Sequence, residues 1–418
     1  MPNDMDIPDC AHAGKKLAAS PVLIFLVALA ARIRVLWQLL PAHAWINFYP
    51  WNEPSRIAWA LVSGFGYCSP WPGTGLAPTA VLPPVYPLLL AGIFKMGGPY
   101  SLPSLWMAAG LNAIFSACSA VLIVRLGQGD FGEATGTLAA WIWSLWLYEA
   151  TVSVRLWESS LAAAMLAGTI LWLPKLRQSQ SLLEWLLFGL WAALAVLTNT
   201  TLLAVFLVFW LWLGMGRGRR EPHFVRNGLL AIAVAILCLL PWTVRNYRAF
   251  HRVIPVRDNF GLELWIGNHP GGDGQFLHEL PLFDPTLYNR LGETAFMEQK
   301  REIAWQFIRQ HPGVFLRRSG ARCLRYWSAP NGSLWPLVSL LAWAGLFLLC
   351  WRKEPAAVPF AIVMVFFPLT YYATHSVATY RHPIEPMVIL LAVYALWSGV
   401  ERCVGKVRRA SDFLPDHQ

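Results

Sequence analysis

The sequence predicts an all-α, polytopic membrane protein with about ten transmembrane helices. Further juxtamembrane helices are expected along the non-cytoplasmic face of the membrane. Three observations predict this fold class. Of the 418 residues, 56% are hydrophobic and 13% are charged, whereas about 25% of the residues in a soluble domain are charged. The 23 tryptophans suit the aromatic belts at membrane interfaces. Apolar runs of roughly spanning length recur along the chain and are separated by basic loops.

The expected spans follow one another from the N-terminal apolar run to the last one. They cover residues 21–40, 102–125, 135–150, 158–174, 183–199, 200–215, 227–245, 333–351, 357–373 and 384–400. The apolar run 82–96 is left out, because it is short, contains three prolines and carries Lys95. We predict a juxtamembrane or re-entrant helix there.

Basic residues indicate which side each loop lies on. With 82–96 left out, the Lys and Arg residues of the short loops share one side with Lys15 and Lys16, as the positive-inside rule requires. We therefore expect cytoplasmic N- and C-termini. One membrane domain would cover residues 1–400, including two outer loops, and a basic cytoplasmic tail would follow at 401–418. The outer loops are residues 41–101 and 246–332.

Composition also argues against several classes of site. The net charge of +10 comes mostly from the loops, and no basic stripe on a soluble domain indicates nucleic acid as a partner. The seven cysteines form no C-x-x-C pair, so neither a zinc site nor a disulfide framework is indicated. The sequence has no P-loop, which would point to ATP-driven transport.

Two acids are candidate catalytic residues. Glu53 lies in the first outer loop, where a carboxylate could accept a proton from a hydroxyl nucleophile. Its alternative role is that of a solvated acid at a helix N-terminus. Glu158 lies near the outer end of the fourth span, three residues after Arg155, so an ion pair within one helix competes with catalysis. Glu149 is equally ambiguous. Glu53 and Glu158 alone would supply few ligands for Mg²⁺ or Mn²⁺.

Several arginines are candidate anion ligands. Arg32 and Arg34 lie deep in the first span, where a cavity that binds an anionic group competes with snorkelling to an interface. Arg245 and Arg248 follow Pro241 near the end of the seventh span. Their planar donors match phosphate oxygens, but contact with lipid headgroups is the strong alternative.

A second basic group lies at the start of the last span. Arg381 and His382 would suit a phosphate at headgroup depth. Arg381 and Glu385 are four residues apart, so a structural salt bridge is the alternative.

Four segments together resemble one family. They read PPVYPLLLAGIFKMGG, PWTVRNYRAFHRVIPVRDNFGLELWIGN, NRLGETAFMEQKREIAWQFIRQHPGVFL and TYRHPIEPMVIL. In this order they resemble bacterial C-type (GT-C) membrane glycosyltransferases, the superfamily of the protein O-mannosyltransferases and lipid A aminoarabinose transferases. The resemblance covers about residues 30 to 400. It does not identify the particular sugar or acceptor.

The resemblance implies inverting transfer of a sugar from a polyprenyl-phosphate donor, at a site facing away from the cytoplasm. The acceptor hydroxyl would belong to a glycan, a lipid or a protein. The membrane would be the inner (plasma) membrane of a bacterium. No definite cofactor is implied, and a divalent cation stays open.

The resemblance also assigns roles to residues. It makes Glu53 the catalytic base and Glu158 the second acid. Arg381 is the first candidate for the donor phosphate, with Arg245, Arg248 and His382 beside it. Many relatives carry a paired acidic motif where this chain has Asn52-Glu53.

Two functions from other classes remain as alternatives. A transporter or flippase for a lipid-linked sugar would share the cavity and the arginines but would need no base. Transporters often contain internal repeats, and none is evident here. A non-catalytic role in assembly is the third functional hypothesis.

Overall fold

The computed structural model describes residues 19–39, 52–215, 222–273, 283–328 and 334–411, and all regular elements within these ranges are helical. Six helices are long and apolar enough to cross a membrane by themselves. They are α2 (Pro21–Leu39), α6 (Leu102–Leu126), α9 (Ser159–Gln178), α12 (Pro222–Phe250), α18 (Trp335–Arg352) and α21 (Glu385–Ser411). The chain is therefore an integral, multi-pass membrane protein, as the sequence predicted.

Shorter helices account for the remaining predicted spans. They are α7 (Glu133–Leu145), α8 (Leu147–Ser153), α10 (Leu182–Thr198), α11 (Leu202–Gly214), α19 (Ala357–Phe366) and α20 (Leu369–Ala373). The span predicted at 135–150 is broken at Trp146, whose backbone is extended. The span predicted at 357–373 is broken next to Pro368, because proline cannot donate a helical hydrogen bond.

Small residues allow the long helices to pack closely. A Cβ at Gly189 of α10 would lie 2.2 Å from the carbonyl oxygen of Ala231 in α12. A Cβ at Gly345 of α18 would lie 2.1 Å from the carbonyl oxygen of Leu391 in α21. These distances are shorter than any real contact, so both positions require glycine, as close helix packing in membranes commonly does.

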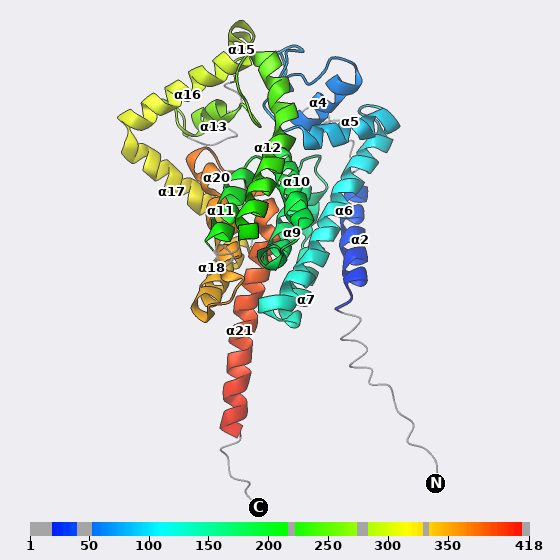
Figure 1. Ribbon diagram of the computed structural model, residues 1–418, viewed down its shortest axis with the longest axis vertical. Coiled ribbons are helices and arrows are strands. Elements are labelled where there is room, and N and C mark those ends of the chain that lie inside the picture. The colour runs from blue at the N-terminus through cyan, green and yellow to red at the C-terminus, as the bar shows by residue number, and fades with distance from the viewer. Residues whose placement is uncertain (1–18, 40–51, 216–221, 274–282, 329–333, 412–418) are drawn as a thin grey trace, which may run out of the picture.

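The helices of the two outer loops gather at one end of the bundle (Figure 1). They are α4 (Glu53–Val62), α5 (Val85–Gly97), α13 (Phe260–Gly267), α15 (Pro285–Leu291), α16 (Glu293–Gln310) and α17 (Pro312–Ser328). With 13 residues, α5 is about 20 Å long, too short to cross a hydrocarbon core of about 30 Å. The π-helical turn η1 (Gly127–Phe131) and the 3₁₀-helix η4 (Ala378–Ile384) complete the described elements.

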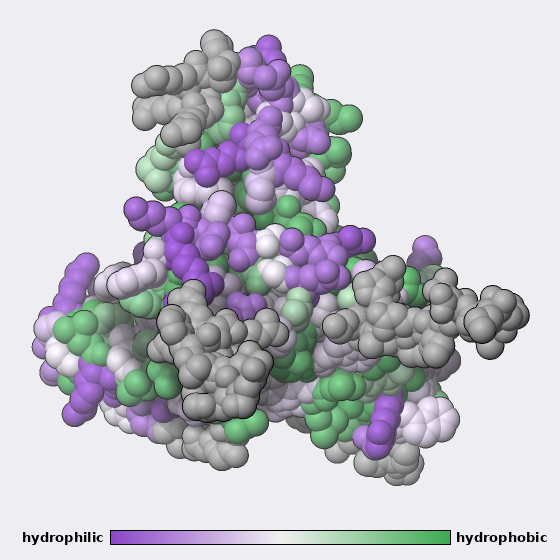
Figure 2. All heavy atoms as spheres, turned by 90° about the horizontal axis from the view of Figure 1, so that it is seen from below, coloured by the Kyte–Doolittle hydropathy of each residue, from purple (hydrophilic) through white to green (hydrophobic). Residues whose placement is uncertain are grey.

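The start of α2 and the end of α21 lie at the other end of the bundle (Figure 1). The last turns of α6, α9 and α18 are basic and carry Arg125, Lys175 and Arg352, among others. Viewed from below, hydrophilic residues form a band across the middle of the view and also lie in its upper part and at its left edge, with hydrophobic residues between them (Figure 2). The two ends therefore differ in structure: one carries the basic last turns of these spans, and the other carries the outer-loop helices, whose last turns are also basic at Arg290, Arg309 and Arg325.

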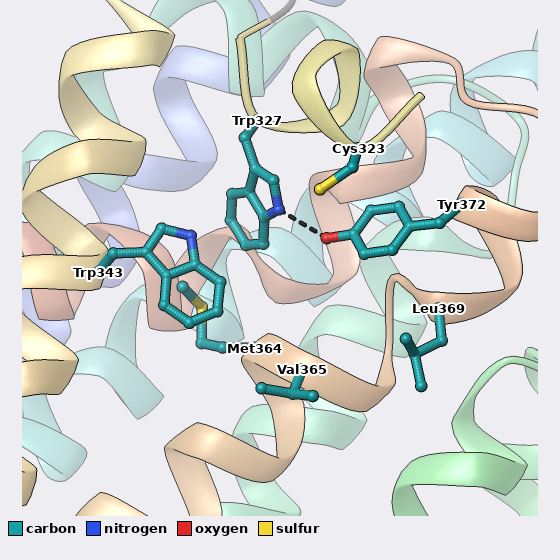
Figure 3. Close-up of a pocket in the computed structure, with 7 residues that line it drawn as sticks. All are labelled: Cys323, Trp327, Trp343, Met364, Val365, Leu369 and Tyr372. Atoms are coloured by element: carbon teal, nitrogen blue, oxygen red, sulfur yellow. Dashed lines mark hydrogen bonds between the residues drawn. The ribbon is translucent and has the colours of Figure 1, made fainter. Parts of the chain in front are cut away.

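An apolar cavity of about 320 Å³ lies between α17, α18, α19 and α20 (Figure 3). It is lined by Cys323, Trp327, Trp343, Met364, Val365, Leu369 and Tyr372.

Candidate active site

Glu53 is fixed at the first turn of α4. Asn52 caps this helix, because its side-chain oxygen accepts a hydrogen bond from the Ser55 backbone N–H at 3.3 Å. The indole Nε1 of Trp71 donates to Glu53 Oε1 at 2.7 Å. The Glu53 side chain is partly buried, so a carboxylate stands at the outer end of the bundle with one oxygen held by an indole.

Glu158 is held by a second set of amides. It precedes the first residue of α9, and Asn199 Nδ2 donates to its Oε1 at 3.3 Å. Asn112 Nδ2 fixes the preceding turn by donating to the carbonyl oxygens of Arg155 and Trp157. Arg155 itself is exposed and forms no ion pair with Glu158, so the alternative of a structural Arg155–Glu158 pair is wrong.

Asn52 also connects the two acid-bearing segments. Its Nδ2 donates to the carbonyl oxygen of Leu156 at 2.8 Å, two residues before Glu158. The same side chain therefore caps the helix that begins with Glu53 and holds the turn that leads to Glu158. Asn52 is therefore an anchor between the segments that carry the two acids.

Arg257, Glu263 and His375 form a second part of the site. Arg257 Nη2 contacts Glu263 Oε1 at 3.2 Å, and its Nε donates to the carbonyl oxygen of Val81 at 2.8 Å. Asn259 Nδ2 also bonds Glu263 Oε1, and His375 Nε2 contacts Glu263 Oε2. His375 is buried and lies between α20 and η4. Glu263 thus holds a guanidinium and an imidazole that come from different parts of the chain.

Electrostatics joins the two parts into one site. Burial raises the pKa of the Glu53 carboxyl, and the nearby Glu263 adds to this rise, whereas Trp71, Arg257 and His375 oppose it. Glu158 interacts with both Arg257 and Glu53. We call this group the outer cluster. It consists of Glu53, Glu158, Arg257, Glu263 and His375.

The acids of the outer cluster differ in proton affinity. Burial alone would raise the pKa of Glu263, but His375, Arg257 and Asn259 outweigh it, so this pKa lies below its ordinary value. Glu263 therefore stays ionised and keeps its cations, while Glu53 binds a proton more readily than an ordinary glutamate. A carboxylate with a raised pKa is suited to general-base chemistry near neutral pH.

Two predicted phosphate ligands lie elsewhere in the outer part. Arg245 donates to the carbonyl oxygens of Tyr67 and Thr79 at 2.6 and 2.5 Å, and it lies over the rings of Tyr67 and Trp242. It therefore clamps the first outer loop to α12. Arg248 is exposed on α12. Among the described residues, neither arginine forms a hydrogen bond or an ion pair with a member of the outer cluster, although the Tyr67 side chain interacts electrostatically with Arg245, Arg257 and Glu158.

Arg381 lies in a buried ion pair. Its Nε and Nη2 donate to the two carboxylate oxygens of Glu385, and its Nη1 donates to Ser339 Oγ at 2.5 Å. The guanidinium also lies 4.2 Å from the ring centroid of Trp335. Both members of the pair have 0% exposed side chains. The salt bridge that the sequence offered as the alternative is formed, and it occupies the donors proposed for phosphate.

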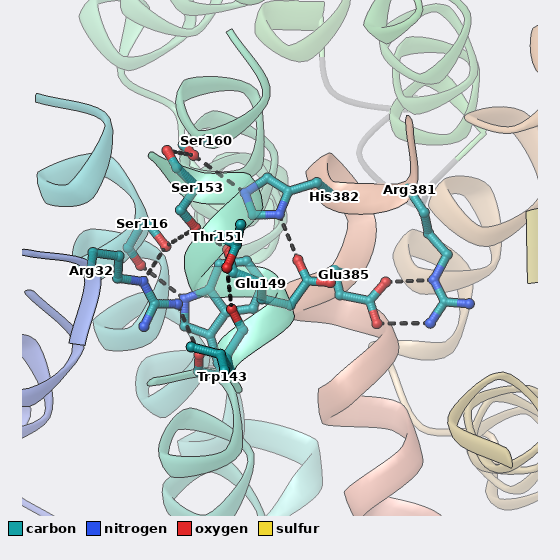
Figure 4. Close-up of polar contacts among 11 residues, drawn as sticks. Arg32, Ser116, Trp143, Glu149, Thr151, Ser153, Ser160, Arg381, His382 and Glu385 are labelled. Carbon is teal, nitrogen blue, oxygen red and sulfur yellow. Dashed lines mark hydrogen bonds and ion pairs between the residues drawn. The ribbon is translucent and has the colours of Figure 1, made fainter. Parts of the chain in front are cut away.

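His382 faces a different carboxylate in the same interior (Figure 4). Its Nδ1 lies 2.6 Å from Glu149 Oε2, and its Nε2 lies 3.3 Å from Ser160 Oγ. The Glu149 side chain is fully buried, and its Oε1 takes no hydrogen bond from any described residue. His382 is therefore enclosed by protein rather than turned toward the outer cluster.

Arg32 extends the same interior toward α2 (Figure 4). It donates to Ser116 Oγ at 3.0 Å and to the carbonyl oxygens of Ser144 and Trp143 at 2.5 and 2.8 Å. The anion-binding role considered for Arg32 is wrong, since protein oxygens take these donors; Arg34 is exposed. We call this group the buried network. It consists of Arg32, Glu149, Arg381, His382 and Glu385.

Within the described residues, no three His, Cys, Asp or Glu side chains converge closely enough to hold a metal ion.

Comparison with known proteins decides the family. A model of the Alg9-like mannosyltransferase family matches residues 20–260, which is more than half of the chain. The chain belongs to the Alg9-like mannosyltransferase family. This family match covers α4 with Glu53, the turn with Glu158, and Arg257. It confirms the predicted class of membrane glycosyltransferase.

Solved structures support the same fold for this Alg9-like chain. The archaeal oligosaccharyltransferase AglB from Archaeoglobus fulgidus, in complex with an inhibitory peptide and a dolichol-phosphate, is 13% identical with a TM-score of 0.52. The match covers 95% of this chain and 52% of that one. The apo form of the Archaeoglobus fulgidus oligosaccharyltransferase gives a TM-score of 0.54 at 13% identity and covers 93% and 52% of the two chains. This chain thus spans about half the length of these enzymes. No curated protein matches it.

Sequence reasoning missed part of the outer cluster. Arg257 and Glu263 stood only as letters within one quoted family-like segment, and His375 was not singled out. The available signal was the segment RDNFGLEL, which places Arg257 six residues before Glu263 in one of the family-like motifs. His375 gives no comparable local signal, because it is 112 residues from its partner Glu263.

Proposed function

We propose that this chain transfers a sugar from a polyprenyl-phosphate donor to an acceptor hydroxyl, with inversion at the anomeric carbon. Membership of the Alg9-like mannosyltransferase family supports the reaction class and makes mannose the first sugar to test. The dolichol-phosphate in the complex of AglB supports a lipid phosphate as the carrier. A glycan, a lipid or a protein remains the acceptor class. The transporter or flippase alternative has no support from the comparisons.

One observation carries this proposal: a carboxylate with a raised pKa, Glu53, is held by Trp71 and interacts electrostatically with Arg257, a guanidinium that Glu263 holds. In the proposed step the acceptor oxygen forms a bond to the anomeric carbon while Glu53 takes its proton. The bond between the anomeric carbon and the phosphate oxygen breaks, and the polyprenyl phosphate leaves with the electron pair. The charge that develops on phosphate is met by Arg257 and by a ring N–H of His375.

The other members of the outer cluster act through these groups. Glu263 is a positioning residue, since its two oxygens hold Arg257 and His375. Glu158 is the second acid and accepts hydrogen bonds from hydroxyls of the sugar or the acceptor. In this assignment Arg257 and His375 take the phosphate role that the sequence gave to Arg381, Arg245, Arg248 and His382.

The proposed orientation follows the positive-inside rule. The basic end of the bundle, where α2 starts and α21 ends, would face the cytoplasm, and the outer cluster would face the opposite side. For a bacterial chain this is the outer face of the inner (plasma) membrane. The donor could then reach the site from the bilayer and the acceptor from the aqueous side.

The test is transfer by a Glu53→Gln variant in purified, folded protein. The substrate is radiolabelled polyprenyl-phosphate mannose with an acceptor alcohol. Loss of a general base lowers turnover by about 10²- to 10⁴-fold, and we expect a loss of this size at unchanged donor binding. The exposed acid Glu302 on α16 supplies the matched control, so Glu302→Gln should retain wild-type turnover. Wild-type turnover by Glu53→Gln would remove Glu53 as the base, and an intact donor moved across the bilayer would favour transport.

A further inference from the structure

Tyr380 adjoins the outer cluster but has no role in the step proposed above. The centroid of its ring lies 5.5 Å from that of His375, and His375 in turn contacts Glu263. Tyr380 also interacts electrostatically with Glu53 and Arg257. Its phenol therefore lies in the field of both the proposed base and the proposed phosphate ligand.

The hydroxyl of Tyr380 is not used by the fold. Tyr380 is partly exposed, and no described residue forms a hydrogen bond with its hydroxyl oxygen. The adjacent ring of Tyr371, whose centroid is 4.7 Å away, differs in this respect, because its hydroxyl lies 3.1 Å from Thr201 Oγ1. One phenol of the pair is held by protein, whereas the other keeps its donor and its acceptor for a ligand.

The ring and the backbone hold Tyr380 in place. Its backbone N–H donates to the carbonyl oxygen of Val377 at 3.0 Å. Its ring packs on Tyr371, which is itself supported by the buried rings of Tyr326 and Phe367 at centroid distances of 5.9 and 5.8 Å. A phenol on such a support is preorganised, so little conformational freedom is lost when it binds a substrate.

Inverting transfer defines where the sugar lies relative to these groups. In such a displacement the nucleophile and the leaving group lie on opposite faces of the sugar ring. With Glu53 on the acceptor side and Arg257 on the phosphate side, a group that interacts with both is suited to contact the sugar itself. The hydroxyl next to the reacting carbon is the one on C2. In glycoside hydrolysis, hydrogen bonds to this hydroxyl strengthen as the transition state forms.

We infer that Tyr380 determines specificity for the donor sugar, because its hydroxyl forms a hydrogen bond with the 2-hydroxyl of the sugar that is transferred. The inference rests on the proposed function, which supplies the positions of the base and the phosphate. It requires a donor with a free hydroxyl on C2, as mannose has, and it disfavours 2-deoxy sugars. A hydrogen bond from Tyr380 to the leaving phosphate is the competing role.

The test removes the two hydroxyls separately and together, in purified protein with polyprenyl-phosphate donors. Tyr380→Phe deletes the phenol hydroxyl, and a 2-deoxymannosyl donor lacks the sugar hydroxyl. A 4-deoxymannosyl donor is the substrate control. We expect Tyr380→Phe to lower kcat/KM about tenfold for the mannosyl and 4-deoxymannosyl donors, and less than twofold for the 2-deoxymannosyl donor. Tyr371→Phe is the matched protein control, since the hydroxyl that it deletes is held by Thr201, and it should change all three donors by one common factor.

Equal losses by Tyr380→Phe for the three donors would overturn the sugar contact and favour the phosphate. Wild-type kcat/KM for every donor would overturn it as well. The denaturation midpoint of Tyr380→Phe should equal that of the wild type, and a fall as large as that of Tyr371→Phe would assign the hydroxyl to the fold. Absence of transfer from every donor by the wild-type protein would instead contradict the proposed function.

Discussion

The outer cluster and the buried network contain the same kinds of residue in opposite states. In the outer cluster three carboxylates share one guanidinium and one imidazole, and the side chains of Arg257 and Glu263 are 27% and 26% exposed. In the buried network the ion-paired side chains are at most 1% exposed. Arg381 donates through Nε and Nη2 to both carboxylate oxygens of Glu385. Arg257 and Glu263 of the first group therefore keep access for a ligand, although His375 beside them is only 1% exposed, whereas no ion-paired side chain of the second group keeps such access.

This difference teaches how to separate chemistry from scaffold in a membrane protein. Charges within a bundle are costly and are often functional, which made Arg381 and His382 attractive in the sequence. A buried charge whose donors are all committed to protein oxygens has no donor left for a phosphate. Access and incomplete pairing, rather than depth in the membrane, mark the candidate site.

Breaking the buried pair should give the largest effect on stability. Arg381→Met leaves Glu385 buried without its partner, which costs about 3–5 kcal/mol of unfolding free energy. Denaturant unfolding in detergent measures this loss, and Arg381→Met/Glu385→Met should recover much of it. Turnover per folded molecule should stay within about twofold of wild type. A stable Arg381→Met protein that no longer binds donor would move Arg381 into the site.

Glu293 tests whether position in an outer loop is enough to make an acid functional. It lies in an outer loop, but its side chain is buried like those of the buried network. It accepts hydrogen bonds from Thr79 Oγ1, the Ala80 N–H and the Tyr288 hydroxyl at 2.5, 2.6 and 2.8 Å. We expect Glu293→Ala to lose about 2 kcal/mol of stability and little turnover per folded molecule. Chemical unfolding at constant pH measures the loss. Full stability with abolished transfer would place Glu293 among the catalytic groups.

The pH dependence of stability gives a second test at Glu293. Burial raises the pKa of this carboxyl to about 7, above its value in the unfolded chain. The folded protein therefore holds a proton that the unfolded chain has lost, so this contribution is complete at low pH and declines as pH rises toward and through 7. Glu293→Gln cannot ionise and should lack this decline, which unfolding measured from pH 5 to 8 detects. An identical decline in wild type and Glu293→Gln would contradict this origin.

Trp71→Phe should give the smallest effect. The indole hydrogen bond lowers the pKa of Glu53, so its removal raises that pKa further. Because the base must be deprotonated, the acid limb of the pH–turnover profile should move to higher pH while the plateau stays near wild type. Trp59→Phe, on the same helix α4 as Glu53 but without this hydrogen bond, is the control. An unmoved acid limb would argue that another group is the base.

Much of the fold could be predicted because hydrophobicity is a local property. The predicted spans coincide with helices, since each apolar run carries its own signal. The breaks at Trp146 and Pro368 were missed, because a kink changes neither hydrophobicity nor span length. The juxtamembrane reading of 82–96 agrees with the short helix α5 at the outer end of the bundle.

The site was predictable only in part, and the reason is physical. Glu53 and Glu158 stood out because acids at the outer ends of apolar segments are rare, and Asn52, which caps the helix of Glu53, bonds the turn that leads to Glu158. The resemblance put Arg381 first among the arginines, but the residues themselves gave no physical ground for a ranking, because each guanidinium is chemically alike until its partners are known. Arg381 reaches Ser339 from 42 residues away, and such pairing has no sequence signal.

The most direct measurement compares Arg257→Gln with Arg381→Gln in one transfer assay, with kcat expressed per folded molecule. If the outer cluster performs the reaction, Arg257→Gln folds normally and loses about 10²-fold or more in kcat, because it removes a donor to the leaving phosphate. The folded fraction of Arg381→Gln then turns over at close to the wild-type rate. Normal turnover by Arg257→Gln, with folded but inactive Arg381→Gln, would contradict the account.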